Sequence, residues 1–414
     1  MAYSITLANR VREYLAEIPH ITVEEKAMFG GLAGKKMKSP CANSLCGSHH
    51  GEFFCQLSMV NCQLFCIFVS SINKVKLIDI MNRRKFFQTT ALSGGLLAVP
   101  SLMSFLPKKT SDSNVVATGC SLKITLGDLE LFLLSDGYMN VSPPQSIFAP
   151  QIPKKDFVNQ MQKLYLNPEL MQMSVNILLI KSANRYILID SGNGKHSGKT
   201  NIGRLPENLI KIGVSPSDIT DVFITHAHGD HIGGLTTPDG KLTFPNAQCY
   251  INKKEYDFWL SPNPDFSKTK YKRTPQQLEQ YLNYSRNILK ALGNHLHFFS
   301  AGDTLFGILK TELAEGHTPG HTLVTIISEG RSLKHLADTV HSPLLIAKPD
   351  WGVLWDTDYQ QGIYTRLRIL ENCYKEHTLI LAGHLPFPGL GYIGKEKDYR
   401  WVPFSYASPE DIII

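Results

Sequence analysis

From residue 121 onward, apolar residues occur in short runs separated by turn residues. Several runs alternate apolar and polar positions, as a half-buried strand requires, because successive side chains of a strand point to opposite faces. We therefore expect strands at 122–126, 130–135, 175–180, 186–190, 221–225, 323–328, 333–337 and 378–382. Turns are expected at Gly127-Asp128, Asp136-Gly137 and Ala183-Asn184.

Two longer segments carry apolar residues every three or four positions, the spacing of one helical face. The first begins at Thr274-Pro275 and ends at Gly293, because proline favours the first helical position and glycine the position after the last. The second begins near Gln360. This order of elements predicts an α/β domain over residues 121–414, with two mostly antiparallel sheets and helices outside both.

The 120 residues before this domain are unlike it. Residues 1–33 combine a helical repeat with a glycine turn and resemble the opening of the TfoX amino-terminal domain family. The strands that should follow are not evident, and so short a fragment cannot bury its own core, so no TfoX-like function is expected. Residues 34–80 show no sustained apolar period and are predicted to be irregular. Their most apolar run, Leu64–Val69, is too short to span a bilayer.

Residues 81–114 have the features of a twin-arginine export signal. Met81 is followed by Arg83-Arg84, an aromatic pair, the apolar stretch Ala91–Leu106 and a polar exit without a clear Ala-x-Ala cleavage site. A buried helix that follows two arginines is the alternative. If translation starts at Met81, the product is expected to be periplasmic or exported by this route, and otherwise cytoplasmic.

Composition and charge reduce the number of functions that the chain could have. Hydrophobic residues make up 43% and charged residues 19% of the chain, as in ordinary globular proteins. The net charge of +6 comes from residues 1–120, which hold 13 Lys/Arg and 7 Asp/Glu, whereas the remainder holds 29 of each. The balanced domain does not support a nucleic-acid partner. The cysteines between Cys41 and Cys66 lack the paired Cys-x-x-Cys spacing of zinc modules, so no structural zinc site is predicted there.

The strongest chemical signal follows the predicted strand 221–225. His226-Ala227-His228-Gly229-Asp230-His231 places four metal-binding side chains within six residues. Such crowding at the edge of a core is costly unless a cation neutralises it. A solvated histidine-rich loop is the alternative, but this spacing at a strand end favours a metal site.

With Ile232-Gly233-Gly234-Leu235 after it, this cluster resembles the signature of the metallo-β-lactamase superfamily, whose fold is an αββα sandwich. The resemblance covers residues 121–414, and Gly316-His317, Ala337-Asp338 and Gly383-His384 match the remaining family positions. It implies that one metal is held by His226, His228 and His317, a second by Asp230, His231 and His384, and that Asp338 bridges them.

The resemblance also implies a cofactor and a role for nearby residues. Two divalent metal ions are expected, with zinc favoured, although manganese, iron and cobalt accept the same donors. Asp230 and Asp338 are the expected catalytic carboxylates, and a hydroxide between the metals would attack the substrate. Asp190 is expected either to orient a ligand histidine or to cap a turn. His321 is assigned a supporting role, and His341 is a candidate for the pocket wall.

The tail suggests a branch of the superfamily. His384-Leu385-Pro386-Phe387-Pro388-Gly389-Leu390 and Trp355-Asp356-Thr357-Asp358 resemble methyl parathion hydrolases, near the N-acyl-homoserine lactonases, although Tyr392 stands where some members have histidine. The implied substrate is a small ester, lactone or phosphotriester, and the apolar tail residues are expected to line a wall beside the second metal. The alternatives are a di-iron oxidoreductase on the same fold, a nucleic-acid-processing enzyme and a metal-binding regulator. No membrane span is expected, and a homodimer is left open.

The position of the arginine pair predicts that functional translation begins at Met81 and that the product is exported folded. A signal of this kind acts at an amino terminus, and 80 preceding residues would bury it in the chain. Amino-terminal peptides of protein purified from its native host should start at or after Met81. Abundant active protein that still carries residues 1–80 would contradict this prediction.

Overall fold

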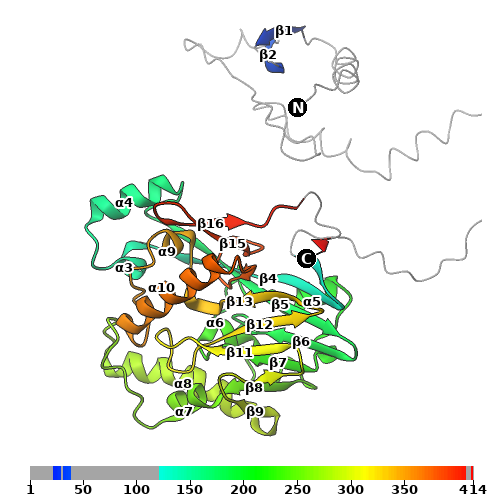
Figure 1. Ribbon diagram of the computed structural model, residues 1–414, viewed down its shortest axis with the longest axis vertical. Helices are drawn as coiled ribbons and strands as arrows, with labels where there is room; N and C mark the ends of the chain where they lie inside the picture. The colour runs from blue at the N-terminus through cyan, green and yellow to red at the C-terminus, as the bar shows by residue number, and fades with distance from the viewer. Residues whose placement is uncertain (1–21, 29–30, 39–120, 407–411, 414) are drawn as a thin grey trace, which may run out of the picture. The chain divides into compact units, whose positions relative to one another are not determined.

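The computed structural model describes residues 22–28, 31–38, 121–406 and 412–413 (Figure 1). The chain divides into two compact units, residues 1–106 and residues 107–414. Within the described residues, no helix is long and apolar enough to cross a membrane. The twin-arginine segment and the proposed start at Met81 lie outside the described residues, as does most of the TfoX-like fragment.

In the first unit, two strands correct the sequence prediction. β1 (Thr22–Met28) pairs antiparallel with β2 (Gly31–Lys38), where we expected no strands. The register sets Glu24 opposite Lys36 and Glu25 opposite Lys35.

The second unit contains two sheets. In the 8-stranded sheet, the strands run antiparallel from β3 to β6 and parallel from β6 to β9. Their order is β17 (Ile412–Ile413), β3 (Ser121–Leu126), β4 (Leu129–Val141), β5 (Met171–Ser182), β6 (Arg185–Ile189), β7 (Asp221–Ile224), β8 (Gln248–Asn252) and β9 (Leu296–Phe299).

The 7-stranded sheet is antiparallel except for the pair β13 and β14. Its order is β10 (Thr304–Leu305), β11 (Leu309–Leu313), β12 (Thr322–Ser328), β13 (Arg331–His335), β14 (Ile380–Leu381), β15 (Leu390–Lys395) and β16 (Tyr399–Pro403). The predicted α/β class, with two mostly antiparallel sheets flanked by helices, is confirmed (Figure 1).

Helices cover the outer faces of both sheets. Three of them, α5 (Leu205–Lys211), α7 (Lys253–Leu260) and α8 (Pro275–Ala291), contribute to the core on the outer face of the 8-stranded sheet. The helix α10 (Tyr359–Lys375) packs on the 7-stranded sheet. A smaller apolar cluster joins α3 (Gln145–Phe148), α4 (Lys154–Lys163) and α9 (Pro343–Ala347) to the ends of β4 and β5.

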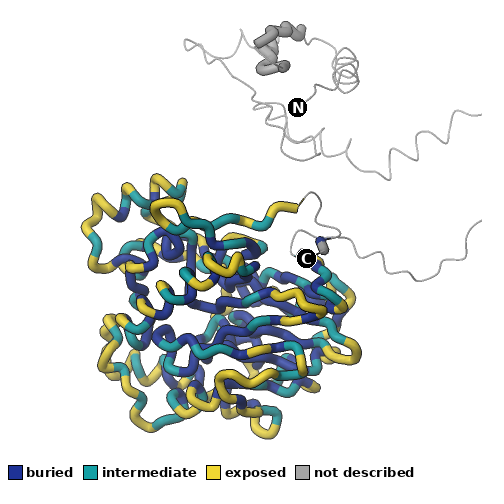
Figure 2. The backbone as a smooth tube through the Cα atoms, viewed as in Figure 1, coloured by how far each residue is buried: buried dark blue, intermediate teal, exposed yellow. Residues whose placement is uncertain are grey.

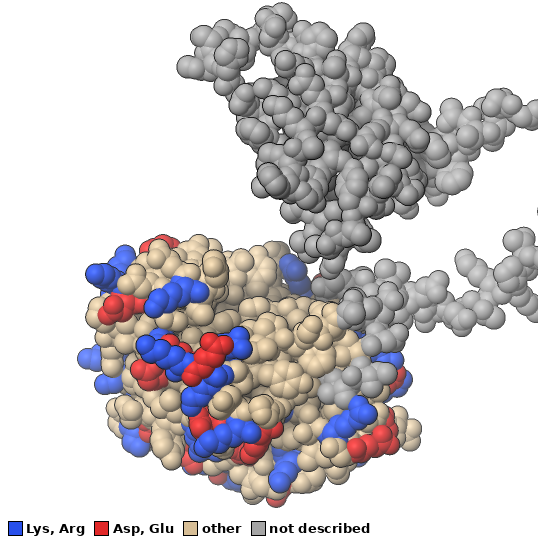
Figure 3. All heavy atoms as spheres, turned by 45° about the horizontal axis from the view of Figure 1, so that its top comes forward, with Lys and Arg blue, Asp and Glu red and all other residues tan. Residues whose placement is uncertain are grey.

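The main core lies between the sheets, where Figure 2 shows many of the strand residues as buried. The alternation along β7 shows why the layers form. Phe223 packs between the sheets and stacks on Phe299 at 5.0 Å, whereas Val222 and Ile224 face the outer helices. On the face seen in Figure 3, basic and acidic side chains are interspersed.

The expected turn at Asp136-Gly137 was wrong, because β4 continues to Val141 through a bulge between Ser135 and Gly137. The Asp136 carboxylate is fully buried and accepts the backbone N–H groups of Asn193, Gly203 and Leu205. Gly137 has a φ of +121°, a backbone conformation that residues other than glycine rarely adopt. The bulge therefore directs an acidic side chain into the core to hold a loop, while the strand goes on.

Replacing Phe223 by alanine should lower the free energy of unfolding by about 3–5 kcal/mol, because it leaves a cavity between the sheets. Phe298→Ala is the matched control, since Phe298 is 46% exposed and its loss should cost under about 1 kcal/mol. Urea unfolding followed by intrinsic fluorescence measures both. Equal losses for the two variants would contradict the assignment of the core.

Candidate metal centre

The seven side chains predicted as metal ligands lie together in the structure. They come from four chain segments at one edge of the two sheets. His226 and His228 follow β7, and Asp230 and His231 lie in the short helix α6 (Gly229–Ile232). The others follow β11, β13 and β14: His317, Asp338 and His384. Within each of two groups, the potential ligand atoms are within 4.8 Å of one another.

Two glycines allow the histidine-rich segment to approach its neighbours. A Cβ atom on Gly233 would lie 2.3 Å from the carbonyl oxygen of Asn193, and one on Gly234 only 1.9 Å from that of Ser191. Both distances are far shorter than atoms tolerate, so a side chain at either position would force the backbones apart. The glycine pair predicted as part of the signature therefore has a packing role.

The first group contains His226, His228, His317 and Asp338. Asp338 Oδ2 lies 3.3 Å from His317 Nε2 and 3.8 Å from His226 Nε2. His228 Nδ1 lies 3.1 Å from His226 Nε2. Three imidazoles and one carboxylate oxygen thus converge on one point, which is a donor set that binds a divalent transition metal.

The second group contains Asp230, His231, His384 and again Asp338. Asp338 Oδ1 lies 3.1 Å from His231 Nε2 and 3.4 Å from His384 Nε2. Asp230 Oδ2 lies 3.3 Å from His384 Nε2. Asp338 therefore offers one carboxylate oxygen to each group, which is the geometry of a bridging ligand.

Orphaned polar atoms show that the residues present fit metal ions. No hydrogen-bond partner is found for His231 Nε2, His317 Nε2, His384 Nε2 or Asp338 Oδ1, although all four atoms are buried. Buried polar atoms without partners are rare because each one costs free energy. Since these atoms point at a shared centre, cations between them would remove that cost.

The buried charges around the two groups lead to the same conclusion. Five carboxylates lie in or against the cluster, together with one guanidinium: Asp190, Asp230, Glu255, Asp338, Asp356 and Arg366. The carboxylates outnumber the guanidinium, so the cluster has an excess of acidic groups that bound cations can balance. The site therefore fits metal ions.

The pKa shifts in the cluster follow from these charges. Burial favours the neutral form of Asp338 and Asp230, but the imidazoles of His231 and His384 outweigh it and hold the pKa of both carboxyl groups below its ordinary value. Burial alone would lower the pKa of His317 and His384. Asp338 together with Asp356 instead raises the pKa of His317 to about 9, and Asp338 together with Asp230 raises that of His384 to about 10. The carboxylates thus attract positive charge to the same nitrogen atoms that would bind metals.

Three of the histidines are oriented by acceptors behind them. The Nδ1 atoms of His231, His317 and His384 lie 2.7–2.8 Å from Asp190 Oδ2, Asp356 Oδ1 and the carbonyl oxygen of Ser174, respectively. An acceptor at Nδ1 holds the proton on that nitrogen, so Nε2 is the atom of each ring that can give up its proton and bind a metal at the centre. Of the two roles expected for Asp190, the structure therefore supports orienting a histidine.

His321 orients the bridging residue. Its Nδ1–H donates to the carbonyl oxygen of Ala314 at 3.0 Å, and its Nε2 accepts the backbone N–H of Asp338 at 3.1 Å. Because both ring nitrogens are used, His321 has no lone pair left for a metal. This agrees with the supporting role expected for it.

His341 lies closer to the centre than a residue of the pocket wall would. Its Nε2 is 3.2 Å from Asp338 Oδ2, and its ring stacks on His384 with centroids 5.5 Å apart. Neither of its ring nitrogens has a hydrogen-bond partner. Burial lowers the pKa of His341 to about 4, so the ring is neutral near pH 7.

Sequence analysis missed the function of three further residues. Asp356, Arg366 and Glu255 lie far along the chain from the residues they contact. The guanidinium of Arg366 donates to three backbone carbonyls and lies 3.5 Å from Asp356 Oδ2, so Arg366 supports the carboxylate that orients His317. Asp356 was named only as part of the segment Trp355-Asp356-Thr357-Asp358, which resembles methyl parathion hydrolases. No sequence motif around Glu255 indicates its function.

The expected apolar wall is mostly wrong. Leu385 and Leu390 are buried in the cores on either face of the 7-stranded sheet, because alternate sides of the segment around β14 and β15 face two different layers. Phe387 is 36% exposed, and its N–H donates to Ser174 Oγ. Of the three residues, only Phe387 can contact a substrate.

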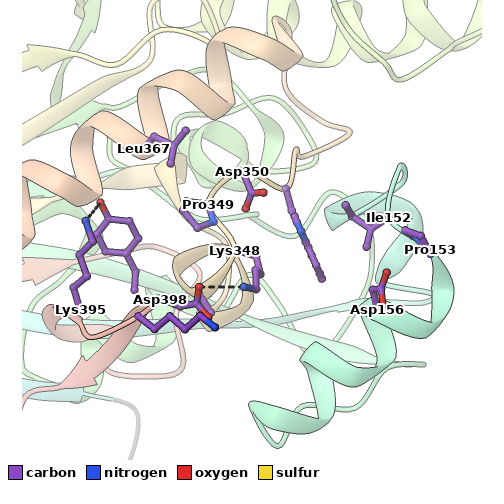
Figure 4. Close-up of a pocket in the computed structure, with 13 residues that line it drawn as sticks. Ile152, Pro153, Asp156, Lys348, Pro349, Asp350, Leu367, Lys395 and Asp398 are labelled. Carbon is purple, nitrogen blue, oxygen red and sulfur yellow. Dashed lines mark hydrogen bonds and ion pairs between the residues drawn. The ribbon is translucent and has the colours of Figure 1, made fainter.

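A hollow of about 530 Å³ lies outside the group of metal-binding residues (Figure 4). Its lining includes Trp351, Leu367 and the ion pair between Lys348 and Asp398, and none of the metal-binding residues. Its wall residues Pro349 and Trp351 offer the carbonyl groups that hold Arg366. Residues in the wall of the hollow therefore support the metal site through Arg366, although the hollow is not part of that site.

Comparisons with known proteins identify relatives of this arrangement. Residues 171–384 match the family described as the metallo-beta-lactamase superfamily. A solved structure of AidC, a dizinc quorum-quenching lactonase in complex with the product N-hexanoyl-L-homoserine, is 38% identical with a TM-score of 0.66, over 70% of this chain and 100% of that one. The hydrolase AbOPH of the beta lactamase superfamily is 29% identical with a TM-score of 0.63, over 70% and 98%.

Among curated proteins, the lactamase-like protein adaB of Aspergillus niger is 31% identical over 139 residues, or 33% of this chain. The match spans 35% of that relative's length. The expected kinship with N-acyl homoserine lactonases is thus supported by a solved structure, and the resemblance to methyl parathion hydrolases stays a prediction.

Wild-type protein reconstituted with zinc should hold two ions per chain, and Asp338→Ala should hold fewer than one, because each group loses a ligand. Thermal unfolding should occur at a lower temperature after chelation, since the buried carboxylates lose their counter-charge. Elemental analysis and calorimetry measure the two effects. Two ions retained by Asp338→Ala at wild-type affinity would refute the bridging assignment.

Proposed function

The chain belongs to the metallo-β-lactamase superfamily, and from that premise we propose that it is a dinuclear zinc hydrolase of lactones and neutral esters. The observation that carries the proposal is the pair of donor groups that share Asp338, one carboxylate oxygen to each. Imidazole and carboxylate donors without thiolate suit zinc. The sequence identity of 38% to a dizinc lactonase, over that protein's full length, supports both the choice of metal and the substrate class.

The chain's own residues prepare the site for hydrolysis. Two divalent ions bound there would polarise a substrate carbonyl and lower the pKa of water toward about 7. Asp230 and Asp338 stay anionic, because the surrounding imidazoles hold the pKa of both carboxyl groups low. Fixed acceptors behind three of the histidines spare the site any reorganisation during the reaction.

His341 is fully buried beside the bridging carboxylate. Its ring is neutral, and its Nε2 lies 3.2 Å from the oxygen of Asp338 that faces the first group. A neutral imidazole can donate one N–H to a carboxylate oxygen. We assign His341 the role of positioning Asp338.

Partly exposed aromatic rings near the centre favour apolar acyl or aryl groups. Trp355 lies 5.8 Å from the ring of His341, and Tyr281 lies 6.0 Å from that of His228. The cation Arg366 is buried and engaged by three carbonyl groups, so it is not free to bind the carboxylate of a β-lactam. A neutral lactone needs no such partner.

On one zinc-loaded preparation, kcat/KM for a long-chain acyl lactone and for a phenyl ester should exceed kcat/KM for a cephalosporin by roughly tenfold or more. A phosphotriester belongs in the same panel, because an activated water can also attack phosphorus. Asp338→Ala supplies the background rate without an intact centre. If the cephalosporin leads the panel, the proposed substrate class is wrong although the metal assignment would stand.

A further inference from the structure

Glu255 is a fully buried carboxylate that no motif marks and that binds no metal in either donor group. It lies in the first turn of α7, on the outer face of the 8-stranded sheet. Its Oε1 accepts the backbone N–H of Ala227 at 2.9 Å and the indole N–H of Trp259 at 2.7 Å. Its Oε2 accepts the hydroxyl of Thr318 at 2.7 Å and the N–H of Gly320 at 2.8 Å.

Three of these hydrogen bonds reach two segments that are distant in sequence, and the fourth, from Trp259, lies within α7. Ala227 stands between His226 and His228, while Thr318 directly follows His317. One carboxylate thus holds the backbone beside every histidine of the first donor group. The second group has other supports, since His231 and His384 are oriented by Asp190 and by the carbonyl oxygen of Ser174.

The surrounding packing shows that the position is built for a carboxylate. The carbonyl of Ala227 accepts the Ser285 hydroxyl at 2.7 Å, so both backbone polar groups of Ala227 have partners. A Cβ atom on Gly320 would lie 2.3 Å from the backbone nitrogen of Glu255, so only glycine lets the His317 segment come this close. The Glu255 carboxylate can accept the N–H of Gly320 only because glycine at position 320 lets the two backbones come so close.

We infer that Glu255 is a positioning residue that holds His226, His228 and His317 in metal-binding geometry and thereby sets the affinity of the first metal position selectively. The inference rests on the proposed dinuclear function. A glutamine at position 255 has one acceptor oxygen, and its NH₂ group would face two donors at the other end. The amide can therefore keep one segment in place but not both.

The test measures zinc binding by the full chain. Wild type and Glu255→Gln are loaded with zinc, dialysed against a graded series of chelator concentrations and analysed for metal per chain. Wild type should retain two ions where Glu255→Gln retains one, which corresponds to a roughly 10- to 100-fold weaker first position. In the Glu255→Gln background, adding His384→Ala should remove the remaining ion, whereas adding His228→Ala should not.

Asp221→Asn is the matched control. Asp221 is also a buried carboxylate, but it binds Arg185 at the opposite end of β7 from His226. This variant should lose stability and still retain two ions. Loss of an ion from Asp221→Asn would overturn the inference, because the effect would then follow from loss of fold stability alone.

A milder variant covers the risk that Glu255→Gln does not fold. Thr318→Val removes one of the four donors with little change of shape, and should weaken the first position only, by a smaller factor. Unchanged affinity in both variants, or parallel loss of both ions, would overturn the inference. A wild-type protein that retains fewer than two ions would overturn the proposed function itself, and this inference with it.

Discussion

Buried negative charge is the constraint on which the rest of this structure depends. Carboxylates such as Asp190, Asp338 and Asp356 lie where two sheets meet, out of contact with water. Charges in such a place are tolerated only when hydrogen bonds and counter-ions compensate them. The helices, the glycine contacts and the imidazoles that surround these carboxylates can be understood as the means by which a stable core accommodates them.

The sequence predicted the features whose signals are local. His226 to His231 form one compact string, and Asp338 and His384 each follow a strand that apolar periodicity detects. The strand β11 before His317 was not predicted. Part of each sheet and the helix α8 were predictable from the same periodicity. The hairpin of β1 and β2 was not, because its residues show no sustained apolar alternation.

The supporting residues could not be predicted, because their roles exist only once the chain is folded. Glu255 lies 28 residues from Ala227, whose N–H it accepts, and Asp356 lies 39 residues from His317, with no motif around the glutamate. The wall prediction for Leu385 and Leu390 failed for a related reason. Apolar residues beside a ligand serve the core as readily as the pocket, and the sequence does not distinguish the two uses.

The two donor groups draw on both sheets, and this has a consequence for how the protein matures. His226 and His231 extend from the 8-stranded sheet, while Asp338 and His384 extend from the other. Neither sheet alone presents a complete set of ligands, and the parallel pairs β6–β9 form only after their long crossovers close. High-affinity metal binding therefore requires that both sheets have formed and packed together. Ions that bind at this late stage of folding then link the two sheets.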